Sequence, residues 1–506
     1  MADFIRNAEM EHPISFNFDN TYARLPERFF ARLEPTPVRL PELIKLNEEL
    51  AQYLGIDPEE LRTVDGVRIL SGSKNAKGAE PLAMAYAGHQ FGSWVPQLGD
   101  GRAILLGELV ASDGSRFDLQ LKGSGRTPFS RMGDGRAVLG PVLREYIVSE
   151  AMHCLGIPTT RALAAVSTGE GVVRENLLPG AILTRVAKSH VRVGTFQFFS
   201  ARKDGDAIRA LADYVIQRNF PDLKTGASAS PYHDLLREVV ARQAKLVAKW
   251  QLVGFIHGVM NTDNTSVVGE TIDYGPCAFM DFYHPDTVYS SIDQSGRYSF
   301  GNQPGIAYWN LGCFAQTLLP LLDEDSAKAL SQAEEILGTY PDLFQQSYLL
   351  GLSKKMGLLK ELDGDQKLGQ DLLRVMELNE ADYTLTFRGL SPLGSGNGNA
   401  NGSVRHLFKK PDQFDEWELR WRKRLSEESF SPAQREQFMK TVNPAFIPRN
   451  HLIEEAIKLA VDDNDFFEFH RLVEVLSNPY ENQADTEKYA VPPRPEQIVR
   501  ATFCGT

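Results

Sequence analysis

The stretch from His257 to Gly275 reads HGVMNTDNTSVVGETIDYG, and it decides how the rest of the chain is interpreted. Asn264 brings an amide oxygen, and Asp273, nine residues further on, brings a carboxylate. Oxygen atoms of these two kinds are hard ligands of the sort that Mg²⁺ binds in proteins. The stretch therefore predicts a loop that holds a divalent metal. For each residue alone, an Asx turn or an ordinary loop aspartate is the alternative.

The spacing within this stretch is similar to that of the metal-binding loop of protein kinases. There an H-R-D-x-x-x-x-N loop supplies a base at its aspartate and a metal ligand at its asparagine, and the aspartate of a following D-F-G holds Mg²⁺. Here Val259 stands at the position of the base, Asn264 at that of the asparagine, and Asp273 begins a D-Y-G. The usual base is missing while both metal ligands remain. Asp263 is the carboxylate left in the loop to act as a base.

A predicted β-hairpin lies upstream of the loop. The apolar, partly alternating runs 103–110 and 116–122 flank a Ser-Asp-Gly-Ser turn, which is typical of such a hairpin. Lys122 ends its second strand, and Glu145 lies on a helix predicted from Pro141 to Leu155. In kinases a strand lysine pairs with a helix glutamate and orients the phosphates, so we expect a Lys122–Glu145 ion pair. A solvated lysine and a solvent-facing glutamate are the alternatives.

Glycine and arginine residues gather around this hairpin. Glycines let the backbone approach a phosphate closely, and guanidinium forks suit phosphate oxygens. Ordinary turns, a solvated basic face and surface ion pairs would also explain them. The candidate nucleotide contacts are Gly99, Gly101, Arg102, Asp134, Gly135, Arg185 and Arg192, and the run around Asp134 also holds Arg126, Arg131, Arg136 and Arg144.

The remaining periodicity predicts a two-lobed α+β fold, with a β-rich first part and helices dominating from about residue 320 onward. Combined with the kinase-like motifs, this predicts a protein kinase-like bilobal fold with N-terminal and C-terminal helical extensions. The expected parts are an N-terminal extension packing on the core (1–80), a β-rich N-lobe-like part (81–200), a C-lobe-like part with the metal loop (201–320) and a helical C-terminal part (321–506).

Individual elements are predicted from the same patterns. Apolar spacing favours helices over 41–54, 206–218 and 232–256, and strands over 160–167 and 180–186. The Gly/Asn-rich run 391–403 is typical of a flexible loop.

Composition limits the classes of function. A net charge of -12 argues against a general nucleic-acid binder, which needs a broad basic surface. No run approaches the roughly 18 apolar residues of a membrane span, and the N-terminus lacks an apolar signal region, so we expect a cytoplasmic protein. The four cysteines form no C-x-x-C pair, which gives no sign of a zinc site or a disulfide scaffold.

Several long motifs together resemble the selenoprotein O family of kinase-fold pseudokinases, which transfer AMP from ATP onto protein side chains. The resemblance covers most of the chain and implies an ATP bound flipped relative to ordinary kinases. The motifs that carry it are QLGDGRA, LQLKGSGRTPFSR, GDGRAVLG, SEAMHCLGIPTTRAL, HGVMNTDNTS, IDYGP, GRYSFGNQP and NPAFIPRNHLIEEAI.

The resemblance implies roles for individual residues. Asp263 corresponds to the proton acceptor, Asn264 and Asp273 to the ligands of Mg²⁺ or Mn²⁺, and Lys122 and Glu145 to the ion pair. Asp273 also belongs to the nucleotide site, together with the glycine and arginine candidates above. Cys504 stands where eukaryotic members carry selenocysteine, which raises redox control through Cys277 and Cys504 as a hypothesis.

The predicted function is nucleotidyl transfer of AMP from ATP, or of UMP from UTP, to Ser, Thr or Tyr hydroxyls of proteins, with self-modification expected. Its partners are protein substrates and a nucleoside triphosphate, with neither nucleic acid nor membrane. An ordinary phosphotransferase with a relocated base is one alternative. A catalytically inactive, nucleotide-binding pseudokinase scaffold is the other.

Overall fold

The computed structural model describes residue Ile14 and residues 16–224, 230–395 and 404–503. The chain divides into two compact units, and each takes segments that are far apart in the sequence. The first unit contains residues 1–84, 99–138 and 162–186, and the second contains residues 85–98, 139–161 and 187–506. The mixed α/β composition predicted from the sequence is confirmed, with antiparallel strand pairs in both units.

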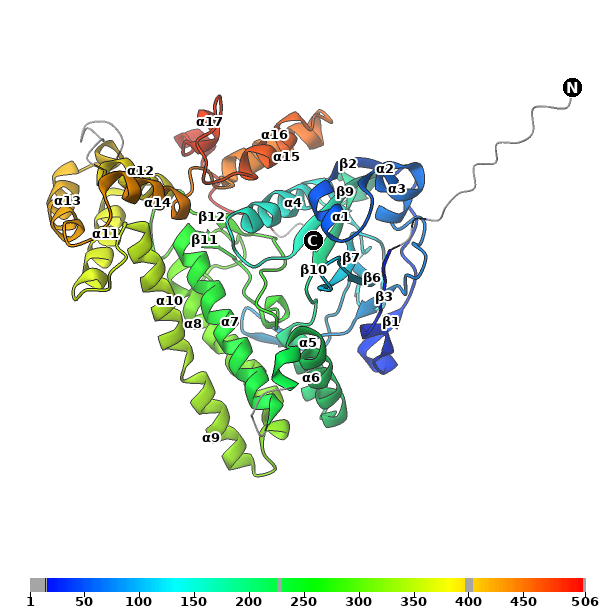
Figure 1. Cartoon of the computed structure of the whole chain (residues 1–506). Coiled ribbons are helices and arrows are strands. Elements are labelled where there is room, and N and C mark those ends of the chain that lie inside the picture. Colours follow the sequence, from blue (N-terminus) through cyan, green and yellow to red (C-terminus); the bar gives the residue numbers. More distant parts are fainter. Residues whose placement is uncertain (1–13, 15, 225–229, 396–403, 504–506) are drawn as a thin grey trace, which may run out of the picture. The chain divides into compact units, whose positions relative to one another are not determined.

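The first unit is built on one sheet (Figure 1), whose strand order is β1-β3-β6-β7-β10-β9-β2, with β8 paired to β10. The predicted hairpin is confirmed, because β6 and β7 pair antiparallel from Ala103↔Lys122 to Val110↔Arg116. The strands are β1 (Phe30–Arg32), β2 (Glu42–Leu46), β3 (Leu82–Met84), β6 (Ala103–Val110), β7 (Arg116–Lys122), β8 (Ala137–Val138), β9 (Arg161–Val173) and β10 (Leu177–Ala187).

The two faces of this sheet differ in chemistry because successive side chains of a strand point to opposite faces. On β7, Leu119 and Leu121 join a buried apolar cluster with residues of β10 and of the N-terminal helices. Gln120 and Lys122 alternate with them, and both are buried polar side chains. The sheet therefore has one apolar core face and one face with buried polar groups.

The helix predicted over 41–54 is wrong in its first half. Glu42–Leu46 forms β2 and pairs with β9, so the pairing of the strand overrides the helical spacing of its apolar residues. The helix α1 begins only after Asn47, whose side chain accepts a hydrogen bond from the Leu50 amide at 3.1 Å. Helices α1 (Glu48–Tyr53), α2 (Pro58–Arg62) and α3 (Val64–Leu70) follow one another.

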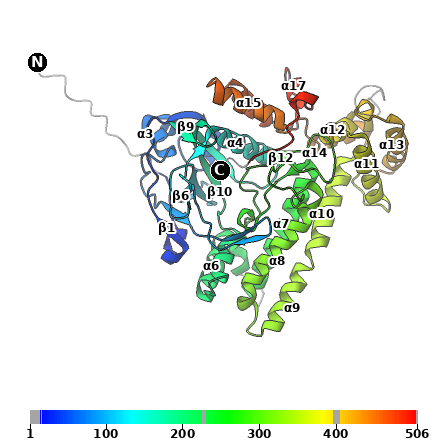
Figure 2. The ribbon, with the colours of Figure 1, turned by 180° about the vertical axis from the view of Figure 1, so that it is seen from behind.

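The second unit is mainly helical, and its long helices α7, α8, α9 and α10 run side by side in both views (Figures 1 and 2). A second apolar cluster, with Trp417 and Trp421 at 0% exposure, forms its C-terminal core. The helices are α4 (Leu139–Cys154), α5 (Val193–Ser200), α6 (Gly205–Asn219), α7 (Pro231–Val253), α8 (Gln303–Leu322), α9 (Ser326–Leu337), α10 (Tyr340–Lys355), α11 (Asp365–Asn379), α12 (Tyr383–Gly394), α13 (Pro411–Leu425), α14 (Pro432–Val442), α15 (Asn450–Asp462), α16 (Phe467–Leu476) and α17 (Glu487–Ala490).

Two strand pairs complete the second unit. The strands β11 (Phe255–Ile256) and β12 (Ala278–Phe279) pair antiparallel and flank residues 257–277, which we call the metal loop after the site that the sequence predicts in it. A small hairpin of β4 (Gly88–Gln90) and β5 (Ser93–Val95) belongs to the same unit.

Two of the expected boundaries in this unit need correction. The helix predicted over 232–256 ends at Val253, because Gly254 adopts a left-handed conformation with φ 74° and terminates it. The flexible loop predicted over 391–403 is helical up to Gly394, where α12 ends, and residues 396–403 lie outside the described residues.

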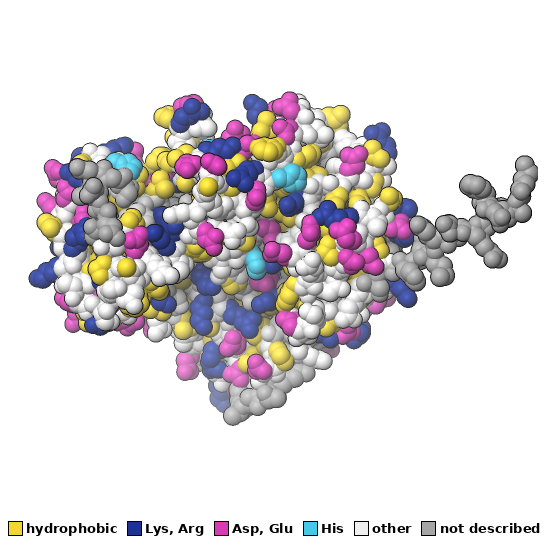
Figure 3. Space-filling view, turned by 45° about the horizontal axis from the view of Figure 1, so that its top comes forward, with side chains coloured by type: hydrophobic (Ala, Val, Ile, Leu, Met, Phe, Trp, Pro, Cys, Tyr) yellow, Lys and Arg dark blue, Asp and Glu magenta, His cyan; other side chains and the backbone are white. Residues whose placement is uncertain are grey.

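Across the parts of the chain that the structure describes, no helix is both long and apolar enough to span a membrane. Acidic and basic side chains are interspersed on the face drawn in Figure 3.

Candidate functional site

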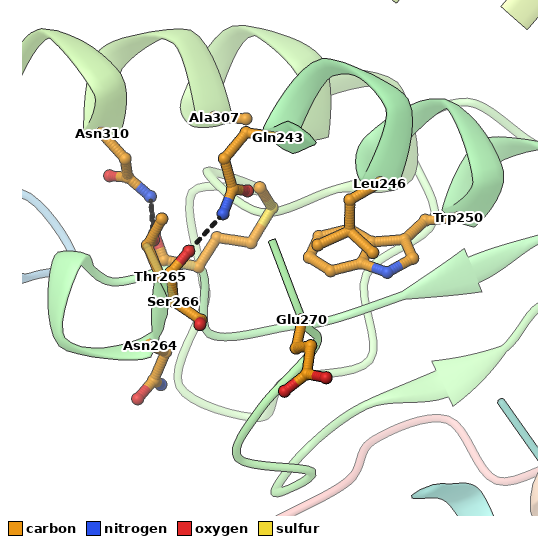
Figure 4. A pocket seen from close by; sticks show the side chains of 10 residues that line it. Gln243, Leu246, Trp250, Asn264, Thr265, Ser266, Glu270, Ala307 and Asn310 are labelled. Atoms are coloured by element: carbon orange, nitrogen blue, oxygen red, sulfur yellow. Dashed lines mark hydrogen bonds between the residues drawn. The ribbon is translucent and has the colours of Figure 1, made fainter. Parts of the chain in front are cut away.

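The metal loop starts directly after β11 and is held by its own residues. His257 is buried, its Nε2 lies 2.9 Å from the Ile272 carbonyl oxygen, and burial lowers the pKa of its imidazole. The Asn264 amide nitrogen donates to the Val259 carbonyl at 3.0 Å, which closes the loop. The Asn264 side chain points away from the helices that carry Gln243 and Asn310 (Figure 4).

Two helices anchor the loop from behind. From α8, the Asn310 amide donates to the Met260 carbonyl at 2.9 Å and to the Thr265 hydroxyl at 3.0 Å. From α7, the Gln243 amide donates to the Ser266 carbonyl at 2.7 Å. The cavity among these side chains (Figure 4) has a volume of about 10 Å³, which is room for about one water molecule and not for a nucleotide.

Arg192 joins two parts of the stretch that the sequence singled out. Its Nη1 donates to the Asp263 carbonyl oxygen at 2.8 Å and to the Asp273 carboxylate at 2.7 Å. Its guanidinium also lies over the Tyr86 ring, 4.6 Å from the centroid. Asp273 has φ 64°, a conformation that is uncommon for a residue other than glycine and that is found at functional sites.

Asp263 is a buried carboxylate whose two oxygens have different surroundings. Oδ2 accepts a hydrogen bond from the Gln90 amide at 2.9 Å, whereas Oδ1 is buried without a hydrogen-bond partner among the described residues. Burial raises the pKa of Asp263 to about 6, and the Gln90 hydrogen bond and the charge of Arg192 oppose that rise. Buried polar atoms are normally paired, so this oxygen marks a candidate reactive group.

The β4–β5 hairpin contacts the same loop, and the sequence analysis missed it entirely. The His89 amide donates to the Thr262 hydroxyl at 2.7 Å, and that hydroxyl donates to Gln197 at 2.6 Å. The Phe91 amide donates to the Asn261 side chain at 3.1 Å. No motif signals the contacts that His89 and Phe91 make with the loop, because each joins residues about 170 positions apart in the chain.

Two side chains of the loop, Asn264 and Asp273, offer oxygen ligands for a divalent metal. Among the described residues, no three His, Cys, Asp or Glu side chains gather as a metal cage. Mg²⁺ is commonly held by only one or two protein ligands with water and phosphate oxygens completing its shell, so a cage is not required. Because the Asn264 nitrogen is engaged by the Val259 carbonyl, its amide oxygen is oriented away from that bond. Asn264 and Asp273 thus fit Mg²⁺ or Mn²⁺ in chemistry.

In the first unit, the glycine turn 99–102 is packed tightly. Gly99 has φ 95°, and a side chain there would collide with the Phe129 ring. The Asp100 carboxylate accepts from the Met84 amide at 3.0 Å, and the Asp100 carbonyl accepts from the Thr127 hydroxyl at 2.7 Å. The loop after β7 therefore fixes the turn that holds Gly99, Gly101 and Arg102.

Lys122 and Arg185 lie on the polar face of the sheet in the first unit. Gln120 and Lys122 are two residues apart on β7, so they share a face, and Arg185 comes from the neighbouring strand β10. The Arg185 Nη1 lies 3.3 Å from the Gln120 side-chain oxygen. Lys122 and Arg185 are only 6% and 2% exposed, and Lys and Arg are rarely buried to this extent unless they are paired.

Asp134 and Gly135 form a second tight turn in that unit. Gly135 has φ 70°, and a side chain there would collide with the Gly125 backbone. Arg174 donates to the Asp134 carboxylate at 2.7 and 3.1 Å, and this hydrogen bonding lowers the pKa of Asp134.

The remaining predicted residues are placed as follows. Glu145 is 1% exposed on α4, in the second unit, whereas Lys122 belongs to the first. Cys277 is fully buried next to the D-Y-G turn. Cys504 lies outside the described residues.

Within the second unit the structure thus brings together Arg192, Asp263 and Asp273, while Lys122, Arg185 and the glycine turns gather in the first. Residues 13–477 match the sequence model of the family described as "Protein adenylyltransferase SelO". The chain belongs to this family.

Members of the SelO family with similar sequences cover nearly the whole chain. A "Protein nucleotidyltransferase YdiU" of Bradyrhizobium diazoefficiens is 61% identical over 494 residues, which is 97% of this chain and 100% of the relative. Proteins of the same name from Rhodopseudomonas palustris (strain BisB5) and Nitrobacter hamburgensis are 58% and 55% identical, over 97% and 100% of this chain and 100% and 99% of the relatives. The SelO family membership predicted from the motifs is confirmed.

Proposed function

We propose that this chain is a protein nucleotidyltransferase that transfers AMP from ATP to Ser, Thr or Tyr hydroxyls, with UTP as a second candidate donor. Family membership supports the reaction class. One observation carries the chemistry: Asp263 keeps a buried oxygen without a described partner, while Arg192 ties its backbone to Asp273. At the position of the ordinary kinase base, Val259 is apolar and buried.

In the proposed step, the acceptor hydroxyl oxygen attacks the α-phosphorus of the nucleotide. A new phosphorus–oxygen bond forms, the bond between the α-phosphorus and the bridging oxygen breaks, and pyrophosphate leaves with the bond's electron pair. Asp263 takes the proton of the hydroxyl. Lys122, Arg185 and Arg192 hold negative phosphate oxygens by charge-assisted hydrogen bonds.

Asn264 and Asp273 would hold the divalent metal, Mg²⁺ or Mn²⁺. When bound, such an ion neutralises charge on the phosphates. Gly99, Gly101, Arg102, Asp134 and Gly135 would contribute backbone and side-chain contacts to the nucleotide, because a glycine turn lets backbone N–H groups approach phosphate oxygens closely.

The proposal includes a protein kinase-like bilobal fold for the mixed α/β architecture. In such a fold Lys122, at the end of β7, pairs with Glu145 of α4 and orients the phosphates.

The deciding experiment incubates the full-length chain and a test protein with Mg²⁺ and ATP labelled on either the α- or the γ-phosphate. Nucleotidyl transfer leaves the α label on protein, and intact-mass analysis then shows the gain of one AMP. Transfer of the γ label would instead establish the phosphotransferase. No transfer of either label, together with retained nucleotide binding, would establish the inactive scaffold.

Redox control through Cys277 and Cys504 stays part of the proposal. The Thr502 hydroxyl donates to the Pro276 carbonyl at 2.6 Å, which ties the chain two residues before Cys504 to the residue before Cys277. Peptide mapping under non-reducing, oxidising conditions tests the link. Recovery of both peptides with unmodified thiols would rule it out.

A further inference from the structure

We propose that Gln90, on the β4–β5 hairpin, is a positioning residue that orients the Asp263 carboxylate for the acceptor hydroxyl. This inference rests on the proposed function, because it assigns Asp263 a role in the transfer. Gln90 is half-buried, and its amide donates to Asp263 Oδ2 at 2.9 Å. Both residues belong to the second unit.

The backbone of Asp263 is fixed independently of its side chain. Arg192 donates to the Asp263 carbonyl at 2.8 Å, and the backbone N–H of Asn264 donates to the backbone carbonyl of Asn261 at 3.0 Å. Neither bond restricts rotation of the carboxylate about its own side-chain bonds. Among the described side chains, Gln90 is the one that donates a hydrogen bond to a carboxylate oxygen of Asp263.

The hairpin itself is rigid enough to serve this purpose. The His89 amide bonds to the Thr262 hydroxyl, and the Phe91 amide bonds to both Asn261 and the Tyr298 hydroxyl at 3.1 Å. Gln90 therefore lies between two backbone amides that are both fastened to the metal loop. The backbone of Gln90, from which its side chain starts, is therefore held in place against the loop.

Close packing supports the same orientation from the other side. An added Cβ on Gly88 would lie 2.6 Å from Asp263 Oδ1, so Gly88 leaves just the space that this oxygen occupies. With Oδ2 engaged by Gln90, Oδ1 is the oxygen left to accept the proton of a substrate hydroxyl. A base must lie within hydrogen-bond reach of the proton that it takes, so fixing Oδ1 affects the chemical step more than nucleotide binding.

The test uses Gln90→Met in the full-length chain, which keeps the length of the side chain and removes the N–H donor. The rate of α-labelled nucleotide transfer is measured against ATP concentration. We expect kcat to fall about 10- to 100-fold while KM for ATP stays within about twofold, as for a mispositioned base. Ser93→Ala is the control, because Ser93 is exposed and pairs with Gln90 across the hairpin.

A second measurement separates positioning from a general structural effect. If Gln90 acts through Asp263, the double variant Gln90→Met/Asp263→Asn is no slower than Asp263→Asn alone, since the group to be positioned is already lost. Unchanged kcat in Gln90→Met, a rise in KM alone, or a further loss in the double variant would each overturn the inference. In those cases wild-type transfer persists and the proposed function stands. Absence of α-label transfer by the wild type would overturn both.

Discussion

Two clusters in the second unit contain the same set of side chains, one arginine and two aspartates, yet they differ in how the arginine is used. In the first, Arg192 Nη1 contacts one carboxylate, that of Asp273 at 2.7 Å, and the backbone carbonyl of Asp263. In the second, Arg449 Nη1 contacts two carboxylates, those of Asp281 at 2.5 Å and Asp382 at 2.8 Å. Arg449 thus contacts the carboxylates of both of its acids directly.

Under the proposed function, the difference separates a buried acid that serves the fold from one that serves the chemistry. Burial raises the pKa of Asp263 and of Asp281, but the largest opposing influence differs. For Asp281 it is the charge of Arg449, whereas for Asp263 it is the hydrogen bond from the neutral Gln90 amide. A buried carboxylate held by an amide can exchange a proton, while one locked to a guanidinium serves mainly as a fixed charge.

The largest expected effect comes from replacing Asp263, the proposed general base in the first cluster. Asp263→Asn removes the proton acceptor and keeps the shape of the side chain, so we expect α-label transfer to fall about 10³-fold. The melting temperature stays close to that of the wild type, because an amide replaces a buried carboxylate without leaving a cavity. Transfer that remains at the wild-type rate would assign the base elsewhere.

Breaking the second cluster should destabilise the fold and leave the chemistry intact. Arg449→Met leaves Asp281 and Asp382 buried without their cation, which costs about 3–5 kcal/mol in the free energy of unfolding. Chemical denaturation measures that loss, and kcat per folded molecule is expected to stay within about twofold of the wild type. Arg494→Met, at an exposed surface ion pair, is the control and should change stability by less than about 1 kcal/mol.

The contrast between the clusters also marks what the sequence could predict. Spacing within a short stretch predicts the candidates Asp263, Asn264 and Asp273, because motif positions follow from local order along the chain. Arg192 was predicted as well, as a phosphate contact, whereas its hydrogen bonds to Asp263 and Asp273 follow from no sequence pattern. These residues share one loop or directly precede the helix α5.

The contacts between the β4–β5 hairpin and the metal loop could not be predicted from the sequence. Gln90 contacts Asp263 across 173 positions, and neither periodicity nor a charge pattern reports a pairing of that kind. The same cause explains the misassigned helix over 41–54: a strand partner in β9, more than a hundred residues away, decides the conformation of Glu42–Leu46. Elements fixed by local signals, such as the β6–β7 hairpin and α4, were predicted with nearly the observed bounds.

A third buried charge sharpens the comparison because its described contacts are aromatic rings. Lys355 is 3% exposed, its Nζ lies 4.5 Å from the centroid of the Phe387 ring, and burial lowers its pKa to about 7. Replacing it in Lys355→Met removes the cost of burying an ammonium, so the free energy of unfolding should rise by about 2 kcal/mol near neutral pH.

The pH dependence of this gain follows from the two states. The unfolded chain keeps the lysine proton up to a pKa of about 10.4, whereas the folded chain releases it above about 7. Between these values the unfolded state binds more protons, so the wild type gains stability as pH rises. The advantage of Lys355→Met is therefore greatest below pH 7 and shrinks toward pH 10. Denaturation series at several pH values, with Lys354→Met as control, check this; a gain independent of pH would contradict it.

The smallest expected effect tests the unpartnered oxygen of the first cluster directly. In Gly88→Ala the added Cβ would lie 2.6 Å from Asp263 Oδ1 and 3.0 Å from the Asp263 Cβ, so the carboxylate must move. We expect kcat to fall about 10-fold with KM for ATP unchanged, because displacing a base affects the chemical step. Steady-state transfer of the α label measures both constants.

The control for this variant is Gly205→Ala at the start of α6, where an added Cβ meets no atom within 4 Å. If Gly88→Ala matched this control in kcat, the position of Oδ1 would be irrelevant to the transfer. Asp263 would then join Asp281 and Asp382 as an acid buried for structure, and the difference between the two arginine clusters would lose its functional meaning. A selective loss of kcat in Gly88→Ala instead ties the unpartnered oxygen to the reacting hydroxyl.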